Sequence, residues 1–317
     1  MSLQWGIITV TQTGGEVSHG TFTFDSMNLA CTIVIVSYNC RQPLQTCLLT
    51  LTSGGDPLTI LVVDNASTDG TAEMLTCDFP TVRLIQNAKN HGFAAACNQG
   101  IRACVSDFIL LLNPDTMLRP ATLLKLTDTM RAQPNIGACG PRVLNTDGSL
   151  QPSCRRFPTL RAMVYDELGL GRLFPHSRRL AKYRMHGWEH DETCDVDQLM
   201  GSCLLLRRMA LEHVGLLDER FFLYFEEVDL CQRLQKTGWR VVFVADATVT
   251  HLGGESSKTD PRNSLGHRYS SLFAFYRKHY PKWQLPILRL FVQIAAFTRV
   301  LCGQRDYWPV ARYAWKL

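Results

Sequence analysis

Short apolar runs alternate with segments of mixed polarity from residue 31 onward. The runs TIVIV, ILVV and ILLL have the composition of buried strands, and a weaker run, VRLI, lies between the second and the third. The intervening segments have helical character, most clearly over 120–133, where Pro120 stands near the start and Pro134 follows the end. This alternation predicts an α/β fold with a mostly parallel central sheet flanked by helices.

Polar side chains follow three of these predicted strands at the points where the strands end. In open α/β sheets, ligands bind beyond the carboxyl ends of the strands. We therefore expect these side chains to line one crevice. They are Ser37, Tyr38 and Asn39 after the first strand, Asp64 and Asn65 after the second, and Asn113 and Asp115 around Pro114 after the fourth.

The second half of the chain is less regular. The segment VLNTDGSL carries an Asp-Gly turn signal and predicts a hairpin, whereas residues 151–197 show no clear period. Order returns with CLLLRR, with a helix from about residue 226, and with the strand RVVFVADATVTH. Residues 256–317 are aromatic and basic with helical stretches and form a C-terminal extension. Residues 1–30 form an N-terminal extension, either a hairpin or partly non-native sequence.

The composition is that of a protein with an ordinary hydrophobic core, and the net charge is mildly positive. The chain is 46% hydrophobic and 19% charged, with a net charge of +5. That charge suits an anionic ligand or a membrane surface and is too weak for a nucleic-acid partner. The twelve cysteines show no zinc spacing and indicate reduced, mostly buried thiols. The start of the chain has no signal-peptide pattern, and no apolar stretch is long and uncharged enough to predict a membrane span.

Four groups could carry chemistry, and each has a structural alternative. Asp115 could bind a divalent cation or close a turn. The acids Glu226, Glu227 and Asp229 could cap a helix, or one of them could act as a base with a raised pKa. His251 could be structural or a metal ligand. The segment with Asn90, Gly92 and Asn98 suits an anion. Dinucleotide-binding, P-loop and nucleophile-elbow motifs are absent from the sequence.

The order of these motifs resembles the inverting family 2 glycosyltransferases, most closely the bacterial rhamnosyltransferase-type enzymes. The blocks are TIVIVSYN, ILVVDNASTDGT, NHGFAAACNQGI, LLLNPDT, GSCLLLRR, GLLDERFFLYFEEVDLCQRL and HLGGES, and they span roughly residues 31–280. The resemblance implies a GT-A fold over 31–255, with a nucleotide half at about 31–140 and an acceptor half at about 141–255.

The resemblance also implies roles for the individual residues. Asp115 and His251 would hold Mg²⁺ or Mn²⁺, and Glu227 would be the catalytic base, with Glu226 and Asp229 as alternatives. The sequence departs from the family at Asn113, where the metal motif usually has a carboxylate, and at Glu227, where an aspartate is usual. The positions that match the nucleotide-sugar site are Ser37, Tyr38, Asn39, Asp64, Asn65, Asn90, Gly92, Phe93, Asn98 and Asn113.

The favoured donor by resemblance is dTDP-L-rhamnose, and the acceptor is a hydroxyl of a saccharide or lipid-linked saccharide in cell-surface polysaccharide synthesis. A UDP- or GDP-hexose donor and an inactive nucleotide-sugar-binding protein remain alternatives.

The C-terminal extension could contact a membrane, dock on the domain or form a homodimer. We expect a cytoplasmic protein, at the inner face of the membrane if that contact forms. Basic residues beside the acceptor half could contact an anionic acceptor or face solvent. They are Arg155, Arg156, Arg161, Arg178, Arg179, Lys182 and Arg184.

Overall fold

The computed structural model describes residues 31–53, 58–174, 177, 179–180, 182–185, 187–253 and 261–316. The expected N-terminal extension and Arg178 lie outside these residues.

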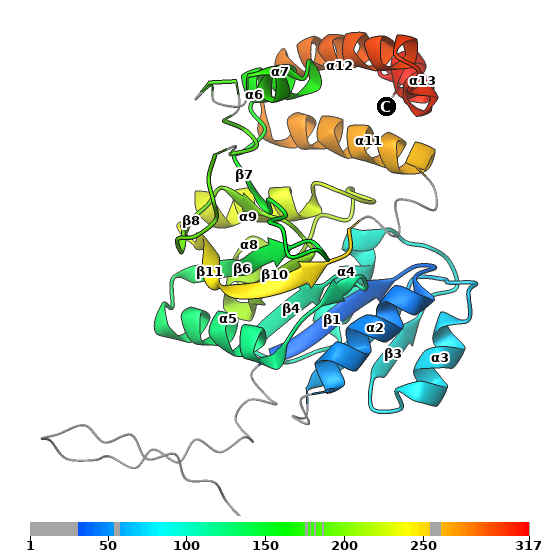
Figure 1. Cartoon of the computed structure of the whole chain (residues 1–317), viewed down its shortest axis with the longest axis vertical. Helices are drawn as coiled ribbons and strands as arrows, with labels where there is room; N and C mark the ends of the chain where they lie inside the picture. The colour runs from blue at the N-terminus through cyan, green and yellow to red at the C-terminus, as the bar shows by residue number, and fades with distance from the viewer. Residues whose placement is uncertain are drawn as a thin grey trace, which may run out of the picture.

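A nine-stranded mixed sheet forms the centre of the molecule (Figure 1). Its order is β3-β2-β1-β4-β10-β6-β11-β5, with β8 paired to β11. The first four strands of this order are parallel to one another, as the apolar runs predict, and β6 is parallel to β11. β10 is antiparallel to both of its neighbours and joins the two parallel groups. The strands are β1 (Cys31–Ser37), β2 (Thr59–Asp64), β3 (Arg83–Gln86), β4 (Phe108–Leu112), β5 (Thr116–Met117), β6 (Ile136–Leu144), β8 (Cys194–Asp195), β10 (Cys203–Arg207) and β11 (Arg240–His251).

Helices cover both faces of the sheet, and alternate strand residues pack against each layer. Ile33 and Ile35 of β1 face a core shared with α2 (Arg41–Thr52), α3 (Thr71–Asp78) and α5 (Pro120–Ala132). Val34 and Val36 face the opposite core, shared with α4 (Phe93–Arg102), α8 (Arg208–Val214) and α9 (Glu226–Lys236). A strand buried on both sides needs an unbroken apolar sequence, which explains the runs in the chain.

The expected hairpin after β6 is present. Leu144 and Leu150 form an antiparallel bridge around a turn in which Gly148 has a φ of 81°. A smaller two-stranded sheet follows, made of β7 (Cys154–Arg155) and β9 (Gln198–Leu199). None of the twelve cysteines, all of which lie in described segments, forms a disulfide.

The C-terminal helices form a further layer above α9 (Figure 1). They pack with α6 (Leu160–Glu167) in a third apolar cluster, beside α7 (Leu170–Leu173). Glu167 is buried at this junction and accepts from Tyr269 Oη at 2.8 Å and from Arg299 at 2.9 Å. The helices are α11 (Pro261–His279), α12 (Gln284–Leu301), the 3₁₀ turn η1 (Arg305–Tyr307) and α13 (Trp308–Tyr313).

By length and composition alone, α12 could cross a membrane, a possibility that the sequence analysis excludes. Only 22% of its 18 residues are buried inside the molecule. Most of α12 is therefore exposed, and the nature of its exposed side chains indicates what it contacts.

Candidate active site

The pairing of β5 with β11 brings the two predicted metal ligands together. Thr116 lies opposite His251 in this antiparallel pair, so the preceding residue, Asp115, lies beside the imidazole. His251 Nε2 is 3.2 Å from Asp115 Oδ1, and both side chains are buried. Asn113 stands next to them, with its backbone N–H donating to the Ser202 carbonyl at 2.9 Å.

Gln151 determines which ring nitrogen of His251 carries the proton and which keeps a lone pair. The Gln151 side-chain oxygen lies 2.7 Å from His251 Nδ1, which must therefore carry the proton. The Gln151 amide nitrogen donates to Asn145 Oδ1 at 2.8 Å, so the orientation of the amide is fixed. His251 Nε2 is buried and makes no hydrogen bond, which leaves its lone pair beside the Asp115 carboxylate.

This pair fits a divalent cation. A neutral imidazole nitrogen and a carboxylate oxygen, oriented by an outer amide, are a common half of a coordination sphere. Within the described segments, no third histidine, cysteine or acid joins them. Further ligands would have to come from water or from the diphosphate of a bound donor.

A second pair of buried polar groups lies at the ends of β1 and β2. Ser37 is directly opposite Asp64 in the parallel register, and both are buried. Ser37 Oγ and Asp64 Oδ2 make no hydrogen bond, although Asp64 Oδ1 accepts from the Ser67 N–H at 3.3 Å. Unsatisfied buried groups are rare in proteins and mark places where a ligand can supply the partner. Tyr38, at the end of β1, is 41% exposed and available for stacking.

Asn39 and Asn65 hold the loops around this pair rather than pointing free groups into the crevice. Asn39 Oδ1 accepts from the Thr68 N–H at 2.8 Å. Asn65 donates to Asn90 Oδ1 at 2.8 Å and accepts from the His91 N–H at 3.1 Å. Asn39 and Asn65 therefore hold the conformation of the loops that follow β1 and β2.

Gly92 begins α4 where another loop crosses it. Its φ is 86°, and a Cβ at this position would lie 2.7 Å from the Phe222 carbonyl oxygen. The next residue, Phe93, donates its N–H to the same oxygen at 2.7 Å. Only glycine combines this φ with this close approach.

Asn98 ties the same two segments together from within. Its side-chain nitrogen donates to the Leu217 carbonyl at 2.8 Å and to Glu219 Oε1 at 2.9 Å. Its oxygen accepts from the Leu217 N–H at 3.1 Å. These contacts occupy the whole amide and fix the loop that leads to the acids of α9.

Glu226 and Glu227 are the two acids whose protonation the site perturbs. Burial, and then the charge of Glu227, raise the pKa of Glu226 well above its usual range. Burial also raises the pKa of Glu227, although the guanidinium of Arg155 opposes the shift. The Oε2 atoms of both are buried without a hydrogen-bond partner. Two neighbouring carboxyls with raised pKa values are candidates for proton exchange with a substrate hydroxyl.

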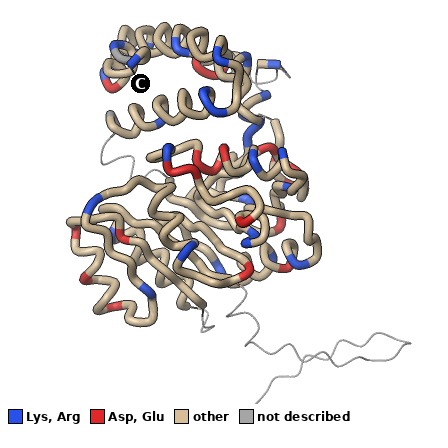
Figure 2. The backbone as a smooth tube through the Cα atoms, turned by 180° about the vertical axis from the view of Figure 1, so that it is seen from behind, with Lys and Arg blue, Asp and Glu red and all other residues tan. Residues whose placement is uncertain are grey.

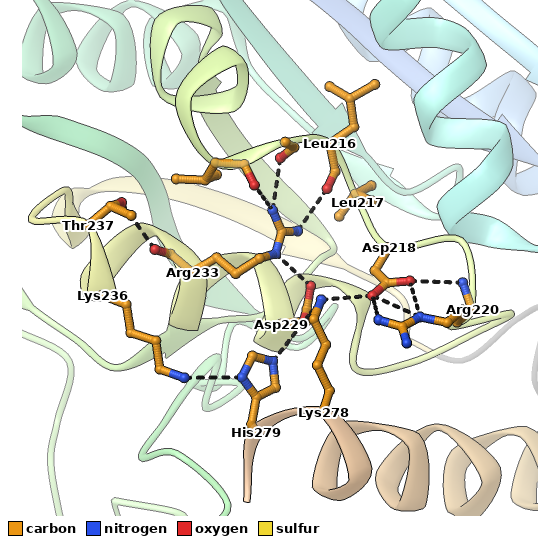
Figure 3. Close-up of polar contacts among 12 residues, drawn as sticks. Leu216, Leu217, Asp218, Arg220, Asp229, Arg233, Lys236, Thr237, Lys278 and His279 are labelled. Atoms are coloured by element: carbon orange, nitrogen blue, oxygen red, sulfur yellow. Dashed lines mark hydrogen bonds and ion pairs between the residues drawn. The ribbon is translucent and has the colours of Figure 1, made fainter.

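Asp229 has a different environment (Figure 3). It lies 2.6 Å from Lys278 Nζ and 2.6 Å from His279 Nε2, and Arg233 Nε donates to it at 2.8 Å. Burial opposes its ionisation, but these donors prevail and lower its pKa. Asp229 is therefore ionised and connects α9 to α11. The remaining candidates for the catalytic base are Glu226 and Glu227.

The loop before these glutamates is strained and is held by α11. Tyr224 and Phe225 have φ values of 69° and 70°, a region that L-residues rarely adopt. Ser271 Oγ donates to the Leu223 carbonyl at 2.8 Å, and the ring of Phe225 contacts Phe275. The sequence gives no signal for the contacts of α11 with this loop, because Ser271 lies about 50 residues after Leu223. It gives none for Gln151 either, which lies 100 residues before His251.

Two of the predicted basic residues are already paired with acids. Arg156 contacts Asp197 at 3.1 Å, and Arg184 pairs with Asp166. Arg155 lies 6.0 Å from the centre of the Tyr183 ring and is near enough to Glu227 to affect its pKa. Of the set, Arg155 is the residue that the structure places beside the candidate base.

Comparison with known proteins identifies the architecture. Residues 32–215 match the family model described as glycosyl transferase family 2. The chain is 35% identical over 269 residues to the N-acetylglucosaminyl-diphospho-decaprenol L-rhamnosyltransferase of Mycobacterium tuberculosis, covering 80% of this chain and 87% of that protein. It is 24% identical to the dTDP-rhamnosyl transferase RfbF of Shigella flexneri, covering 88% and 91%.

A solved structure supports the same fold. The mannosyltransferase PcManGT from Pyrobaculum calidifontis, in complex with GDP-Man and Mn²⁺, superposes with a TM-score of 0.52 at 18% identity, covering 90% of this chain and 73% of that one. The GT-A fold expected from the motifs, with its C-terminal helices, is confirmed.

Proposed function

The chain belongs to glycosyl transferase family 2 and is a glycosyltransferase, and on that premise we propose that it transfers L-rhamnose from dTDP-L-rhamnose to a hydroxyl of a lipid-linked saccharide. The reaction depends on a divalent metal and inverts the anomeric centre. The observation that carries the proposal is the pair Asp115 and His251, at 3.2 Å, at the same end of the sheet as the buried groups of Ser37 and Asp64. Two relatives whose names specify rhamnosyl transfer, each covering at least 80% of the chain, support the donor.

The chemistry needs one base and one leaving group. Glu227 takes the proton of the acceptor hydroxyl as its oxygen bonds to the anomeric carbon, and the bond from that carbon to the diphosphate oxygen breaks with its electron pair on the diphosphate. A divalent cation, when bound, neutralises the charge that develops on the departing diphosphate. Asp115 and His251 would hold it, and Gln151, which keeps the proton on His251 Nδ1, leaves the Nε2 lone pair available for that role.

We favour Glu227 over Glu226 as the base because the Glu227 side chain is partly exposed, whereas that of Glu226 is buried. Arg155 also acts on Glu227, since its positive charge opposes the rise that burial causes in the pKa of this carboxyl. Glu226, whose pKa is raised partly by Glu227, would act as the acid that shares the proton.

A UDP- or GDP-hexose is the second candidate donor. The solved mannosyltransferase with GDP-Man has the same fold, and a fold alone does not select a nucleotide. The position of this step in cell-surface polysaccharide synthesis, and a cytoplasmic location at the inner face of the membrane, belong to the proposal with the lipid-linked acceptor.

Calorimetric titration with dTDP, UDP and GDP, each with and without Mg²⁺ or Mn²⁺, tests the donor. Metal-dependent binding with a preference for dTDP is expected, and a preference for UDP or GDP would refute rhamnose as the donor sugar. Glu227→Gln should abolish transfer and leave nucleotide binding intact. Normal turnover by Glu227→Gln would transfer the role of base to Glu226.

A further inference from the structure

α12 exposes a continuous apolar stripe and keeps its charges on the other side. The side chains of the stripe are between 38% and 87% exposed, and they recur at the three- and four-residue spacing of one helix face. They are Ile287, Leu290, Ile294, Phe297 and Leu301. At about 1.5 Å per residue, the stripe extends over roughly 20 Å. An exposed apolar surface of this extent on a soluble domain marks an interaction site.

The two arginines of α12 are directed into the molecule. Arg299 donates to Glu167 Oε2 at 2.9 Å and to the Glu167 carbonyl at 2.8 Å. Arg289 lies over the ring of Phe273, 5.2 Å from its centre. The exposed face of α12 therefore carries no charge, and its opposite face is fixed to α6 and α11. α12 packs against α6 and α11 on one side and presents the stripe on the other.

Tryptophans and cations surround the stripe. Trp283 precedes α12 and is 60% exposed, and Trp308 and Trp315 follow it at 49% and 50%. Exposed Lys282 and Arg305 stand at the two ends of the helix. Tryptophan and basic side chains around an apolar face are typical of helices that lie at the boundary between lipid headgroups and acyl chains.

The charge of the C-terminal segment helps to distinguish a lipid surface from a second copy of the chain as the partner of the stripe. Residues 261–316 contain ten lysines and arginines and a single acid, Asp306. Arg268 and Arg299 pair with Glu167, and Lys278 pairs with Asp218 and Asp229, so these three cations are compensated inside the molecule. The exposed Lys282 and Arg305 remain at the ends of α12. Figure 2 shows the basic positions distributed along these helices. A symmetric dimer through α12 would place two such segments against each other, which their charge opposes. An anionic lipid surface complements them.

We propose that the exposed face of α12, with Trp283 and α13 beside it, docks on the surface of an anionic lipid bilayer. The helix lies in the plane of the interface, with its stripe among the upper acyl chains and the flanking cations at the headgroups. This docking is a property of the C-terminal layer and needs neither donor nor metal. It would hold the catalytic domain at the surface where a lipid-linked acceptor is found.

Vesicle flotation of the full chain tests the docking without any nucleotide, so its outcome is independent of the proposed reaction. The chain should float with phosphatidylcholine vesicles that contain about one-third phosphatidylglycerol, and less with pure phosphatidylcholine or at high salt. Leu290→Asp should weaken the partitioning at least about tenfold, because a charge replaces a side chain that enters the acyl region. The matched control is Leu49→Asp, which makes the same change at a 56% exposed leucine on α2 and should bind as the unaltered chain does.

A second pair of variants separates charge from apolar contact. Lys282→Glu and Arg305→Glu should reduce binding to anionic vesicles and leave the weak binding to neutral vesicles unchanged. Thermal melts of all variants should match the unaltered chain, since every altered side chain is exposed. The proposal is overturned if the full chain does not bind anionic vesicles or if Leu290→Asp binds as well as Leu49→Asp. Sedimentation equilibrium in which Leu290→Asp converts a dimer to a monomer would instead make this face a subunit interface.

Discussion

Lys278 joins the C-terminal layer to the catalytic domain, and replacing it with methionine isolates that connection. Its ammonium lies 2.6 Å from Asp229 Oδ1 and 2.7 Å from Asp218 Oδ2, between two carboxylates that belong to α9 and to the loop before it (Figure 3). Methionine preserves most of the length of the stem and removes only the charge and its donors. The substitution therefore tests the ion pairs rather than the packing.

The burial of the partners sets the size of the effect. Asp229 is fully buried, Asp218 is 14% exposed and the Lys278 side chain is 23% exposed. Removing one partner of a fully buried pair costs about 3–5 kcal/mol, and an exposed pair contributes at most about 1 kcal/mol. Because Asp229 keeps Arg233 and Asp218 keeps Arg220, we expect Lys278→Met to lower the free energy of unfolding by about 2–3 kcal/mol.

Urea unfolding at neutral pH measures this loss, with Lys125→Met as the control. Lys125 pairs with Asp246 at 3.6 Å, but both side chains are about half exposed or more, so its removal should cost about 0.5 kcal/mol or less. Equal effects of the two substitutions would refute the assignment of a buried network to this junction.

The pH dependence of the loss follows from the lowered pKa values of the two carboxyls. Arg220 and Lys278 lower the pKa of Asp218 against its burial, and His279, Lys278 and Arg233 do the same for Asp229. A carboxyl with a lowered pKa stabilises the fold above its ordinary pKa, and that contribution disappears as pH falls through the lowered value. The difference between Lys278→Met and the unaltered chain should therefore be full at pH 7 and shrink as the medium becomes strongly acidic.

Three further predictions concern the site itself. Gly92→Ala would force a Cβ to within 2.7 Å of the Phe222 carbonyl at a φ of 86°, so the free energy of unfolding should fall by about 2–4 kcal/mol in urea, with a loss of transfer. Glu226→Gln should raise the free energy of unfolding by about 1–2 kcal/mol. Because the pKa of this buried carboxyl is raised, that gain should grow in titrated melts as pH rises above the ordinary glutamate range, and a constant gain would contradict its burial as the cause. Gln151→Leu should weaken Mn²⁺ binding, measured by electron paramagnetic resonance with dTDP present, by about 10–100-fold because His251 loses the partner that fixes its tautomer.

Local sequence patterns predicted the parallel strands of the sheet and the residues that stand at their carboxyl ends. The apolar runs and the polar residues after them obey rules that hold over a few residues, so Ser37, Asp64 and Asp115 were placed correctly at strand ends. The antiparallel position of β10 between β4 and β6 was not predicted. The segment CLLLRR has the composition of any buried strand, and the direction of a strand depends on the path of the chain.

Residue roles that depend on distant partners could not be predicted. Arg233 pairs with Asp229 from within α9, but Lys278 and His279, which anchor it to α11, lie about 50 residues later in the chain. The tautomer of His251 depends on Gln151, which lies 100 residues earlier. The sequence therefore placed these residues along the chain but could not supply the distant partners that fix their orientation and charge.

The C-terminal layer contacts the loop that precedes Glu226 and Glu227. Non-glycine residues with φ near 70° persist only where their surroundings hold them, and here those surroundings are Ser271 and Phe275 of α11. The match to the family model ends at residue 215, before this loop and before Glu227. Since Glu226 follows Phe225 directly and Glu227 comes next, we expect a displacement of α11 to move both carboxyls. α12 packs against α11, so the helix that carries the apolar stripe contacts the helix that holds this loop.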